Sequence, residues 1–356
     1  MEITQRNATF QALAAAVLFG ASAPLAKLLL GQVDPIFLAG FLYLGSGAGI
    51  LLFKLLRTRS TDSEAEAKLS RPDLPWLIGA VVAGGFVAPI VLMFSLRETA
   101  ASTASLLLNF EGVATALIAA VVFKEAISGR ALWALVAVTL GSILLSWNTE
   151  SSWGFSLGAL GIVAACFLWG IDNNLTRNIS AKDPLTIVLV KGLGAGSVSF
   201  VLALLLGSPL PPIMTILGAM LLGSLSYGLS IVLFIRAMRG LGAARTSAVF
   251  GTAPLAGVVL SLVLFQEAPS LLFGGALVLM IAAMALLLTE KHAHPHHHEA
   301  VTHDHRHRHD DGHHNHDHPG MSSRSLAHSH VHTHEALKHE HPHLPDIHHR
   351  HAHHEA

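Results

Sequence analysis

Ten apolar stretches, each long enough to cross a lipid bilayer as a helix, constrain this chain more than any other feature. The hydrocarbon core of a bilayer is about 30 Å thick, which a helix of roughly 20 apolar residues can span. Because no water reaches that core, the backbone must satisfy its own hydrogen bonds, and each stretch is predicted to be helical. The predicted spans are 8–30, 35–56, 75–96, 100–123, 130–147, 154–175, 184–206, 213–235, 243–265 and 271–289.

The composition excludes a water-soluble fold of this size. Only 13% of the residues are charged and 52% are hydrophobic, whereas soluble domains carry about 25% charged residues. The single cysteine, Cys166, excludes a disulfide framework and a CxxC motif within this sequence. The fold class predicted is therefore an all-α integral membrane protein.

Lysine and arginine cluster in alternate loops, which predicts the orientation in the membrane. With the basic loops in the cytoplasm, both termini are predicted to be cytoplasmic, in the inner (cytoplasmic) membrane of the cell. The first span can also be interpreted as a signal peptide, because Arg6 precedes an apolar run and Ala21-Ser22-Ala23 resembles a cleavage site. The run continues to Leu30, which favours a span.

Three short motifs occur twice, in the same order. The first is a glycine followed seven residues later by a basic residue, the second is Asp-Pro, and the third is Phe-x-Glu-Ala. The pairs are Gly20/Gly170, Asp34-Pro35/Asp183-Pro184 and Phe123/Phe265 with Glu125/Glu267. Each repeat holds five spans, and an odd number inserts the second copy upside down. Shared Ala, Leu and Gly content is the alternative explanation.

These repeats divide the chain into residues 8–147, 154–289 and a polar tail, 290–356. Ten spans in two five-helix repeats, with the Gly20/Gly170 turns and the Glu125/Glu267 motif, resemble the EamA-like drug/metabolite transporter superfamily. The resemblance implies a secondary transporter, often an exporter, that does not hydrolyse ATP. The absence of a GxxxxGK[ST] phosphate loop from the sequence agrees with it. With no HExxH or GxSxG motif either, we predict that the protein is not an enzyme.

Glu111, near the middle of the fourth span, is the sharpest candidate for a substrate-binding residue, with Asn109 beside it. An ionisable group at bilayer depth costs several kcal/mol, so it usually faces the bundle interior or a water-filled pathway. Such a carboxylate can bind a solute or exchange a proton during antiport. A structural hydrogen bond to a neighbouring helix is the alternative.

Four further polar residues lie inside the predicted spans. Asp172, Asn173 and Asn174 follow one another in the sixth span, where their oxygens can bind a cation or a polar solute, or can mark an interfacial helix end. Lys191 in the seventh span can extend to the cytoplasm, or pair with Asp172 or Glu111. The family resemblance implies a basic residue at this point of the span.

All 25 histidines lie in the tail, mostly in His-x-His repeats. The tail is too polar to form a packed core and is predicted to be disordered. Imidazole is the commonest metal ligand, so the tail is predicted to bind Ni, Co or Zn, although no cofactor is required. A purification tag and a pH-responsive polyelectrolyte are the alternatives. The candidate ligands are His303, His305, His307, His309, His314, His316, His318, His328, His330, His332 and His334.

Three functions are compatible with these features. The first is efflux of a divalent metal cation gathered by the tail, which resembles a subgroup of the superfamily linked to nickel and cobalt export. The second is export of a small organic metabolite, such as an amino acid or a drug-like molecule, with the tail as an accessory metal buffer. The third is a membrane-anchored metal store or sensor. We predict no nucleic-acid partner and leave a homodimer open.

Overall fold

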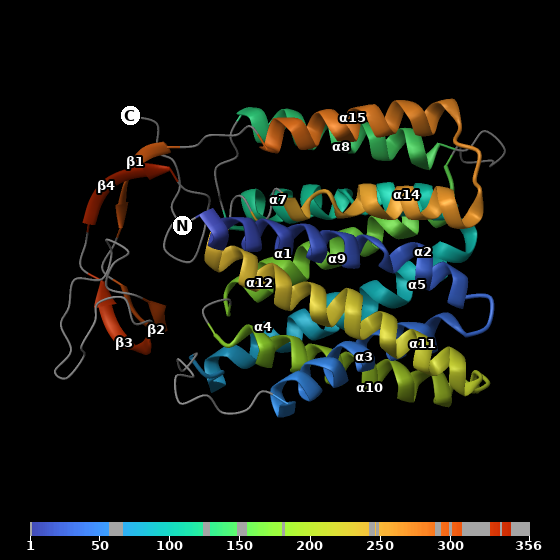
Figure 1. The fold of residues 1–356 in the computed structure, drawn as a ribbon, viewed down its shortest axis with the longest axis horizontal. Helices are drawn as coiled ribbons and strands as arrows, with labels where there is room; N and C mark the ends of the chain where they lie inside the picture. Colours follow the sequence, from blue (N-terminus) through green and yellow to red (C-terminus); the bar gives the residue numbers. More distant parts are fainter. Residues whose placement is uncertain are drawn as a thin grey trace.

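Helices whose axes lie roughly along one line, with successive spans running in opposite directions, form the main body of the protein (Figure 1). The structure is a computed structural model. It describes residues 2–56, 67–123, 129–147, 155–179, 182–241, 246, 249–288, 293–298, 301–307, 328–334 and 337–342.

The first repeat contributes five spans, here called spans 1 to 5. Its helices are α1 (Glu2–Gly20), α2 (Ser22–Leu29), α3 (Pro35–Leu56), the 3-10 helix η1 (Arg71–Asp73), α4 (Leu74–Ala80), the π-helix η2 (Val81–Val87), α5 (Ala88–Glu98), α6 (Ala101–Leu107), α7 (Phe110–Phe123) and α8 (Gly129–Ser146). Span 1 joins α1 and α2, span 3 joins η1 to α5, and span 4 joins α6 and α7.

The second repeat contributes spans 6 to 10. Its described helices are α9 (Leu157–Arg177), α10 (Pro184–Leu205), α11 (Ile213–Gly223), the π-helix η3 (Ser224–Leu229), α12 (Ser230–Leu241), α14 (Ala253–Phe265) and α15 (Leu271–Leu288). Span 8 joins α11, η3 and α12, and span 9 ends with α14.

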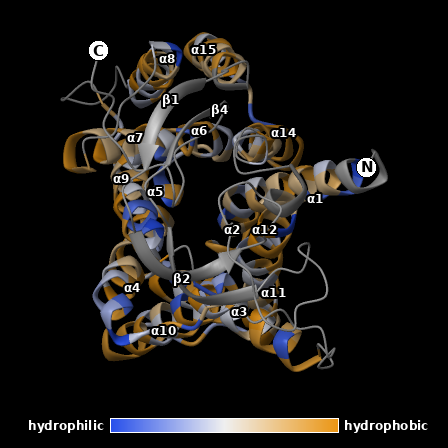
Figure 2. Cartoon of the chain, turned by 90° about the vertical axis from the view of Figure 1, so that its left-hand side faces the viewer, coloured by the Kyte–Doolittle hydropathy of each residue, from blue (hydrophilic) through white to orange (hydrophobic). Residues whose placement is uncertain are grey.

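The prediction of a helical membrane protein is confirmed. In the described residues, eight helices are long and apolar enough to cross a membrane, and two shorter apolar helices, Ala253–Phe265 and Leu271–Leu286, complete the set. Large apolar side chains such as Val121, Leu205 and Leu271 point outward, where lipid is the only solvent that accepts them. Figure 2 shows this hydrophobic exterior along the bundle.

The predicted boundaries need two corrections. The helix of span 1 begins at Glu2, before the predicted start at residue 8, although its apolar part begins at Arg6. Span 9 is not one uninterrupted helix, because a turn at Gly251–Thr252 precedes α14. Glycine favours such an interruption because it lacks a side chain to stabilise the helix.

Packing between the helices follows the repeat. Helix α1 packs against α12 and α14, and its counterpart α9 packs against α5 and α7. The equivalent helices α3 and α10 pack against each other at one edge of the bundle, and α8 and α15 do so at the other (Figure 2). This exchange of partners is the contact pattern expected of two inverted copies related by a pseudo-two-fold axis.

The glycine shared by the two repeats lies where two spans cross closely. A Cβ atom on Gly20 would lie 2.0 Å from the carbonyl oxygen of Ala253, and one on Gly170 would lie 2.9 Å from the carbonyl carbon of Ala114. Only a residue without a side chain allows the backbones to approach this closely. Gly20 therefore seats span 1 on span 9, and Gly170 seats span 6 on span 4.

The repeated Asp-Pro motif lies at the start of the second span of each repeat, α3 in the first and α10 in the second. The Asp34 carboxylate accepts a hydrogen bond from the Ile36 N–H at 2.9 Å, and Asp183 accepts one from the Leu185 N–H at 3.0 Å. Proline fits the first turn because it lacks the N–H that would be unsatisfied there. Asp183 additionally forms a 2.9 Å ion pair with Lys54.

The described parts of the tail form two antiparallel strand pairs, whereas the sequence predicted disorder. The strands are β1 (Ala293–His298) with β4 (Leu337–Pro342), and β2 (Val301–His307) with β3 (His328–His334). An isolated two-stranded ribbon is at best marginally stable in water, so these pairs are compatible with a tail that has no packed fold of its own. His309, His314, His316 and His318 lie outside the described residues.

Replacing Gly20 with alanine tests the close crossing of spans 1 and 9. The added methyl group has no space against Ala253, so we expect the protein to lose roughly 1–3 kcal/mol of stability. Gly274→Ala is the matched control, because a Cβ atom there meets nothing within 4 Å. Thermal unfolding in detergent should show a lower melting temperature for Gly20→Ala alone.

The Asp183 cap predicts a pH-dependent contribution to stability. Partial burial raises the pKa of the Asp183 carboxyl, but hydrogen bonds from Thr186 and Lys54 outweigh burial and hold that pKa below its usual range. The stabilisation is therefore full above the unfolded-state pKa of about 3.9 and is lost as the pH falls through the folded-state pKa.

Asp183→Asn should accordingly lower the melting temperature at pH 7, and the difference from wild type should shrink as the pH falls below about 4. Asp34→Ala removes the equivalent cap, the hydrogen bond from the Ile36 N–H, and should cost about 1 kcal/mol. A difference between wild type and Asp183→Asn that does not change with pH would contradict this account.

Candidate functional site

The candidate site lies where span 4 is interrupted inside the bundle. Residues Leu108 and Asn109 form a turn between α6 and α7, and the N–H of Glu111 bonds to the carbonyl of Leu108 at 3.1 Å instead of continuing the α-helical pattern. Glu111 thus occupies the first turn of α7. Interrupted helices at membrane depth are stable only where other protein groups or a cavity satisfy the backbone.

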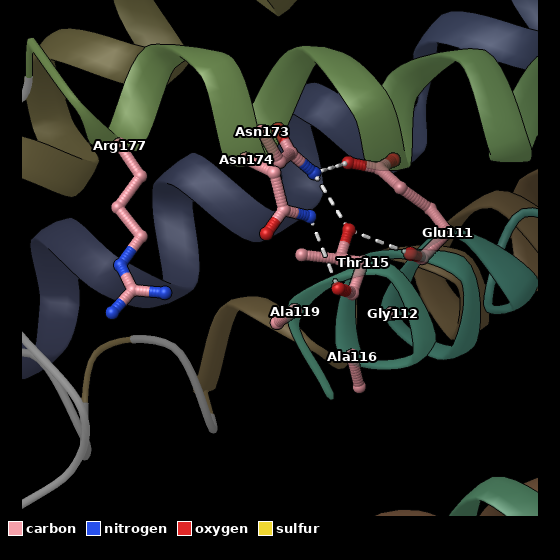
Figure 3. Close-up of a pocket in the computed structure, with 8 residues that line it drawn as sticks. All are labelled: Glu111, Gly112, Thr115, Ala116, Ala119, Asn173, Asn174 and Arg177. Atoms are coloured by element: carbon pink, nitrogen blue, oxygen red, sulfur yellow. Dashed lines mark hydrogen bonds between the residues drawn. The ribbon is translucent and has the colours of Figure 1, made fainter. Parts of the chain in front are cut away.

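Asparagine side chains from α9 hold the carboxylate of Glu111 and the helix that carries it (Figure 3). The amide of Asn173 donates to Glu111 Oε1 at 2.9 Å and to the Thr115 hydroxyl at 3.1 Å. The amide of Asn174 donates to the Thr115 carbonyl at 3.1 Å and to the Gly170 carbonyl at 2.8 Å. These bonds fix α7 against α9 in the register that Gly170 permits.

A cavity of about 410 Å³ opens between the two helices. It is lined by Glu111, Gly112, Thr115, Ala116, Ala119, Asn173, Asn174 and Arg177. Asn173 is exposed at this cavity, about 200° around α9 from the exposed apolar side chain of Ile171. The cavity runs from Glu111 toward the end of α9, where Arg177 lies (Figure 3).

Asp172 and Lys191 form an ion pair beside this cavity. The Lys191 ammonium lies 2.6 and 2.7 Å from the two carboxylate oxygens of Asp172, and the Thr176 hydroxyl donates to the first of them at 2.9 Å. Asp172 is only 5% exposed. A buried carboxylate needs this compensation, because an unpaired charge in a low-dielectric interior is very costly.

The π-helix η2 brings a backbone carbonyl into the same cluster. The Gly84 carbonyl accepts hydrogen bonds from the Tyr43 hydroxyl at 2.7 Å and from Trp169 Nε1 at 2.9 Å. Pro89 is the second residue of α5, which follows η2 directly, and it has no N–H to donate, so the regular α-helical bonding fails at this point. A Cβ atom on Gly84 would also lie 2.0 Å from Asp172 Oδ2, so glycine is required there.

The polar cluster continues into the second repeat through two tyrosines. The rings of Tyr43 and Tyr227 lie 5.7 Å apart, and Tyr227 belongs to η3, the π-helix of span 8. Glu111 is linked to this cluster through Asn173, the residue that follows Asp172 on α9. The irregular segments of spans 3, 4 and 8 therefore surround one polar centre, as in transporters with interrupted helices.

The structure brings together five of the six predicted substrate-binding residues. Glu111, Asn173 and Asn174 line the cavity, and Asp172 pairs with Lys191 next to it. Asn109 is directed elsewhere, because its amide donates to the Leu106 carbonyl and to the sulfur of Met280 in α15.

Sequence analysis missed three contributors to the site. The hydrogen bonds of Tyr43 and Trp169 to the Gly84 carbonyl could not be predicted, because the pattern of apolar residues does not distinguish a π-helix from an α-helix. Arg177 was noted only as the basic residue that follows Gly170, a position that now lines the cavity.

The predicted metal ligands do not form a compact site in the described part of the chain. The strand register sets His303 opposite His332, His305 opposite His330 and His307 opposite His328. No group of three or more His, Cys, Asp or Glu residues within the described ranges is arranged to hold a metal ion. Metal binding by the tail stays a prediction.

Comparison with known proteins identifies the family. A model of the EamA-like transporter family matches residues 7–147 and again 156–289. The chain belongs to the EamA-like transporter family. As a member of this family it is a multi-pass membrane transporter, which agrees with the apolar helices.

The descriptions of two similar proteins do not name a substrate for this EamA-like transporter. A protein of Methanothermobacter thermautotrophicus (strain Delta H) described as an uncharacterized transporter is 28% identical over 293 residues, covering 77% of this chain and 83% of the relative. One crystal structure, described only as that of a protein, aligns with a TM-score of 0.57 at 20% identity over 78% of this chain and 95% of that chain. At this identity the likeness concerns the fold alone.

Removing one partner of the Asp172–Lys191 pair should be more harmful than removing both. Lys191→Met leaves a buried carboxylate without its cation and should cost on the order of 3–5 kcal/mol. The double variant Asp172→Asn/Lys191→Met removes both charges and should recover much of that loss. Thermal unfolding of wild type, Asp172→Asn, Lys191→Met and the double variant measures the coupling, and additive losses would contradict a direct pair.

Proposed function

We propose that this EamA-like transporter is an exporter that works by alternating access around the cavity at Glu111. The single observation that carries the proposal is a cavity-lining carboxylate, held by the amide of Asn173, where span 4 is interrupted. The inverted arrangement of the repeats supports it, because such copies can exchange conformations around a fixed site.

The distribution of charge favours a cargo with a positive group. Lys191 already compensates Asp172, whereas Glu111 forms no ion pair with another described residue. Its hydrogen-bond partner, Asn173, is neutral. A cation entering the cavity would therefore supply the compensation that the carboxylate lacks.

The specific cargo we propose is a divalent metal cation such as Ni²⁺, Co²⁺ or Zn²⁺. The histidine-rich tail supports this cargo, because imidazole binds these ions readily. Carboxylate and hydroxyl oxygens in the cavity are weaker ligands for them, and a pathway must bind an ion weakly enough to release it. In this proposal the tail gathers the ion in the cytoplasm and the cavity passes it on.

Arg177 favours a second candidate cargo. Its side chain lines the cavity at the end away from Glu111 (Figure 3). A cavity with a carboxylate at one end and a guanidinium at the other suits a small organic solute that carries both charges. The tail would then serve as an accessory metal buffer.

Flux measurements in proteoliposomes test the proposed function. Purified protein is reconstituted, and uptake of radiolabelled nickel, cobalt and zinc is compared with that of amino acids, with and without a pH gradient. Glu111→Gln should reduce flux of the cargo about tenfold or more, because a charge-assisted contact worth about 1.5–3 kcal/mol is lost. If protons drive export, Glu111→Gln should also abolish the response to the gradient.

Two controls make this experiment decisive. Asp73→Asn changes a carboxylate outside the cavity lining, which bonds to Ser70 at the start of span 3 and lies 3.9 Å from the Lys182 ammonium, and should leave flux unchanged. Deletion of residues 291–356 should reduce metal flux at low metal concentration only. Normal flux in Glu111→Gln would rule out the cavity as the cargo site.

A further inference from the structure

Four spans are tied together at the end of the bundle opposite to the termini. The Lys27 ammonium, from α2, donates to the carbonyl oxygens of Leu96, at 2.9 Å, and Thr99. The carboxylate of Glu267, just after α14, accepts hydrogen bonds from the N–H groups of Ala101 at 2.7 Å and Ser102 at 3.0 Å. Spans 1 and 9 therefore both hold the turn that joins spans 3 and 4.

The charges of Lys27 and Glu267 suit the backbone groups that they contact. Lys27 meets carbonyl groups at the C-terminal end of α5, where a helix attracts cations. Glu267 meets N–H groups that the first turn of a helix leaves unsatisfied. These side chains take the place of the water that the backbone groups would otherwise bind. The hydrogen bonds hold only while the spans stay together at this end of the bundle.

The contact made by Glu267 crosses between the repeats. Glu267 belongs to the second repeat, whereas Ala101 and Ser102 belong to the first. A rocking movement of one repeat against the other must break these two hydrogen bonds. Lys27 lies on α2, beside α5 and α14, so its bonds depend on the same arrangement.

We propose that Lys27 and Glu267 form a gate that closes the transport pathway at the end opposite to the termini. This inference rests on the proposed alternating access. The gate opens when span 9 leaves the turn between α5 and α6, and both residues then lose their backbone partners together. Neither residue binds the cargo, since both lie outside the lining of the Glu111 cavity.

The repeat places a matching basic residue at the other end of the bundle. Arg177 follows Gly170 by seven residues, as Lys27 follows Gly20, and it lies at the cavity end nearest the termini. Glu125 matches Glu267 but lies outside the described residues. Because the copies are inverted, a gate at one end implies a second gate at the other, and alternating access requires that the two open in turn.

Cysteine labelling measures the gate without any cargo. The reporter is Gly112→Cys in a Cys166→Ser background, because Gly112 lines the cavity and a Cβ atom there meets nothing within 4 Å. A membrane-impermeant maleimide is added from the side opposite to the termini of oriented proteoliposomes. Lys27→Ala and Glu267→Gln should each raise the labelling rate about fivefold or more, because each weakens two hydrogen bonds to a charged group.

Two matched variants separate a gate from a general loss of packing. Lys27→Arg keeps the charge and should keep labelling slow. Lys54→Ala breaks an ion pair with Asp183 at the other end of the bundle and should leave the rate unchanged. All variants are first shown to be monodisperse by size-exclusion chromatography.

Unchanged labelling in both Lys27→Ala and Glu267→Gln would overturn the gate, as would an equal increase in Lys54→Ala. Faster labelling in only one of the two still assigns the gate to that residue. The labelling does not depend on which solute is carried. A failed gate is therefore distinguishable from a failed cargo site, which the flux through Glu111→Gln tests separately.

Discussion

Backbone hydrogen bonding in a medium without water is the constraint on which the rest of this structure depends. Most of each span satisfies it as a regular helix. Among the described residues, the exceptions include the π-helices η2 and η3, the break between α1 and α2 at Ala21, and the turns in spans 4 and 9. In span 3 the freed carbonyl of Gly84 is bonded by Tyr43 and Trp169. The polar side chains gather at these exceptions because they are the places where the backbone needs partners.

Charge is handled in two ways at this polar centre. Asp172 is deeply buried and is compensated permanently by Lys191. Glu111 is reached from a cavity and has a neutral partner, Asn173. The difference separates a structural charge pair from a carboxylate that can exchange partners. The second repeat has Ala253 where the first has Glu111, so the proposed cargo site is asymmetric although the scaffold is repeated.

The sequence predicted the helical spans and the repeat well, because apolar length and recurring motifs depend directly on bilayer thickness and local backbone geometry. The Asp34 and Asp183 motifs became helix caps, and Gly20 and Gly170 became close crossings. Side-chain contacts between spans that are far apart in the sequence were harder to predict. The pairing of Lys191 with Asp172 was one of several alternatives, and Asn109 was expected to join the site although it turns toward Met280. A side chain's direction at a helix break depends on tertiary packing, which periodicity does not reveal.

The claim that the cavity at Glu111 takes a cation can be tested by diffraction. Crystals of the protein grown with cobalt are measured at the cobalt absorption edge, so that anomalous difference density locates the bound ions. The account predicts a peak in the cavity between Glu111 and Asn173, absent from Glu111→Gln. Density confined to the histidine-rich tail, or a cavity peak that survives in Glu111→Gln, would contradict it.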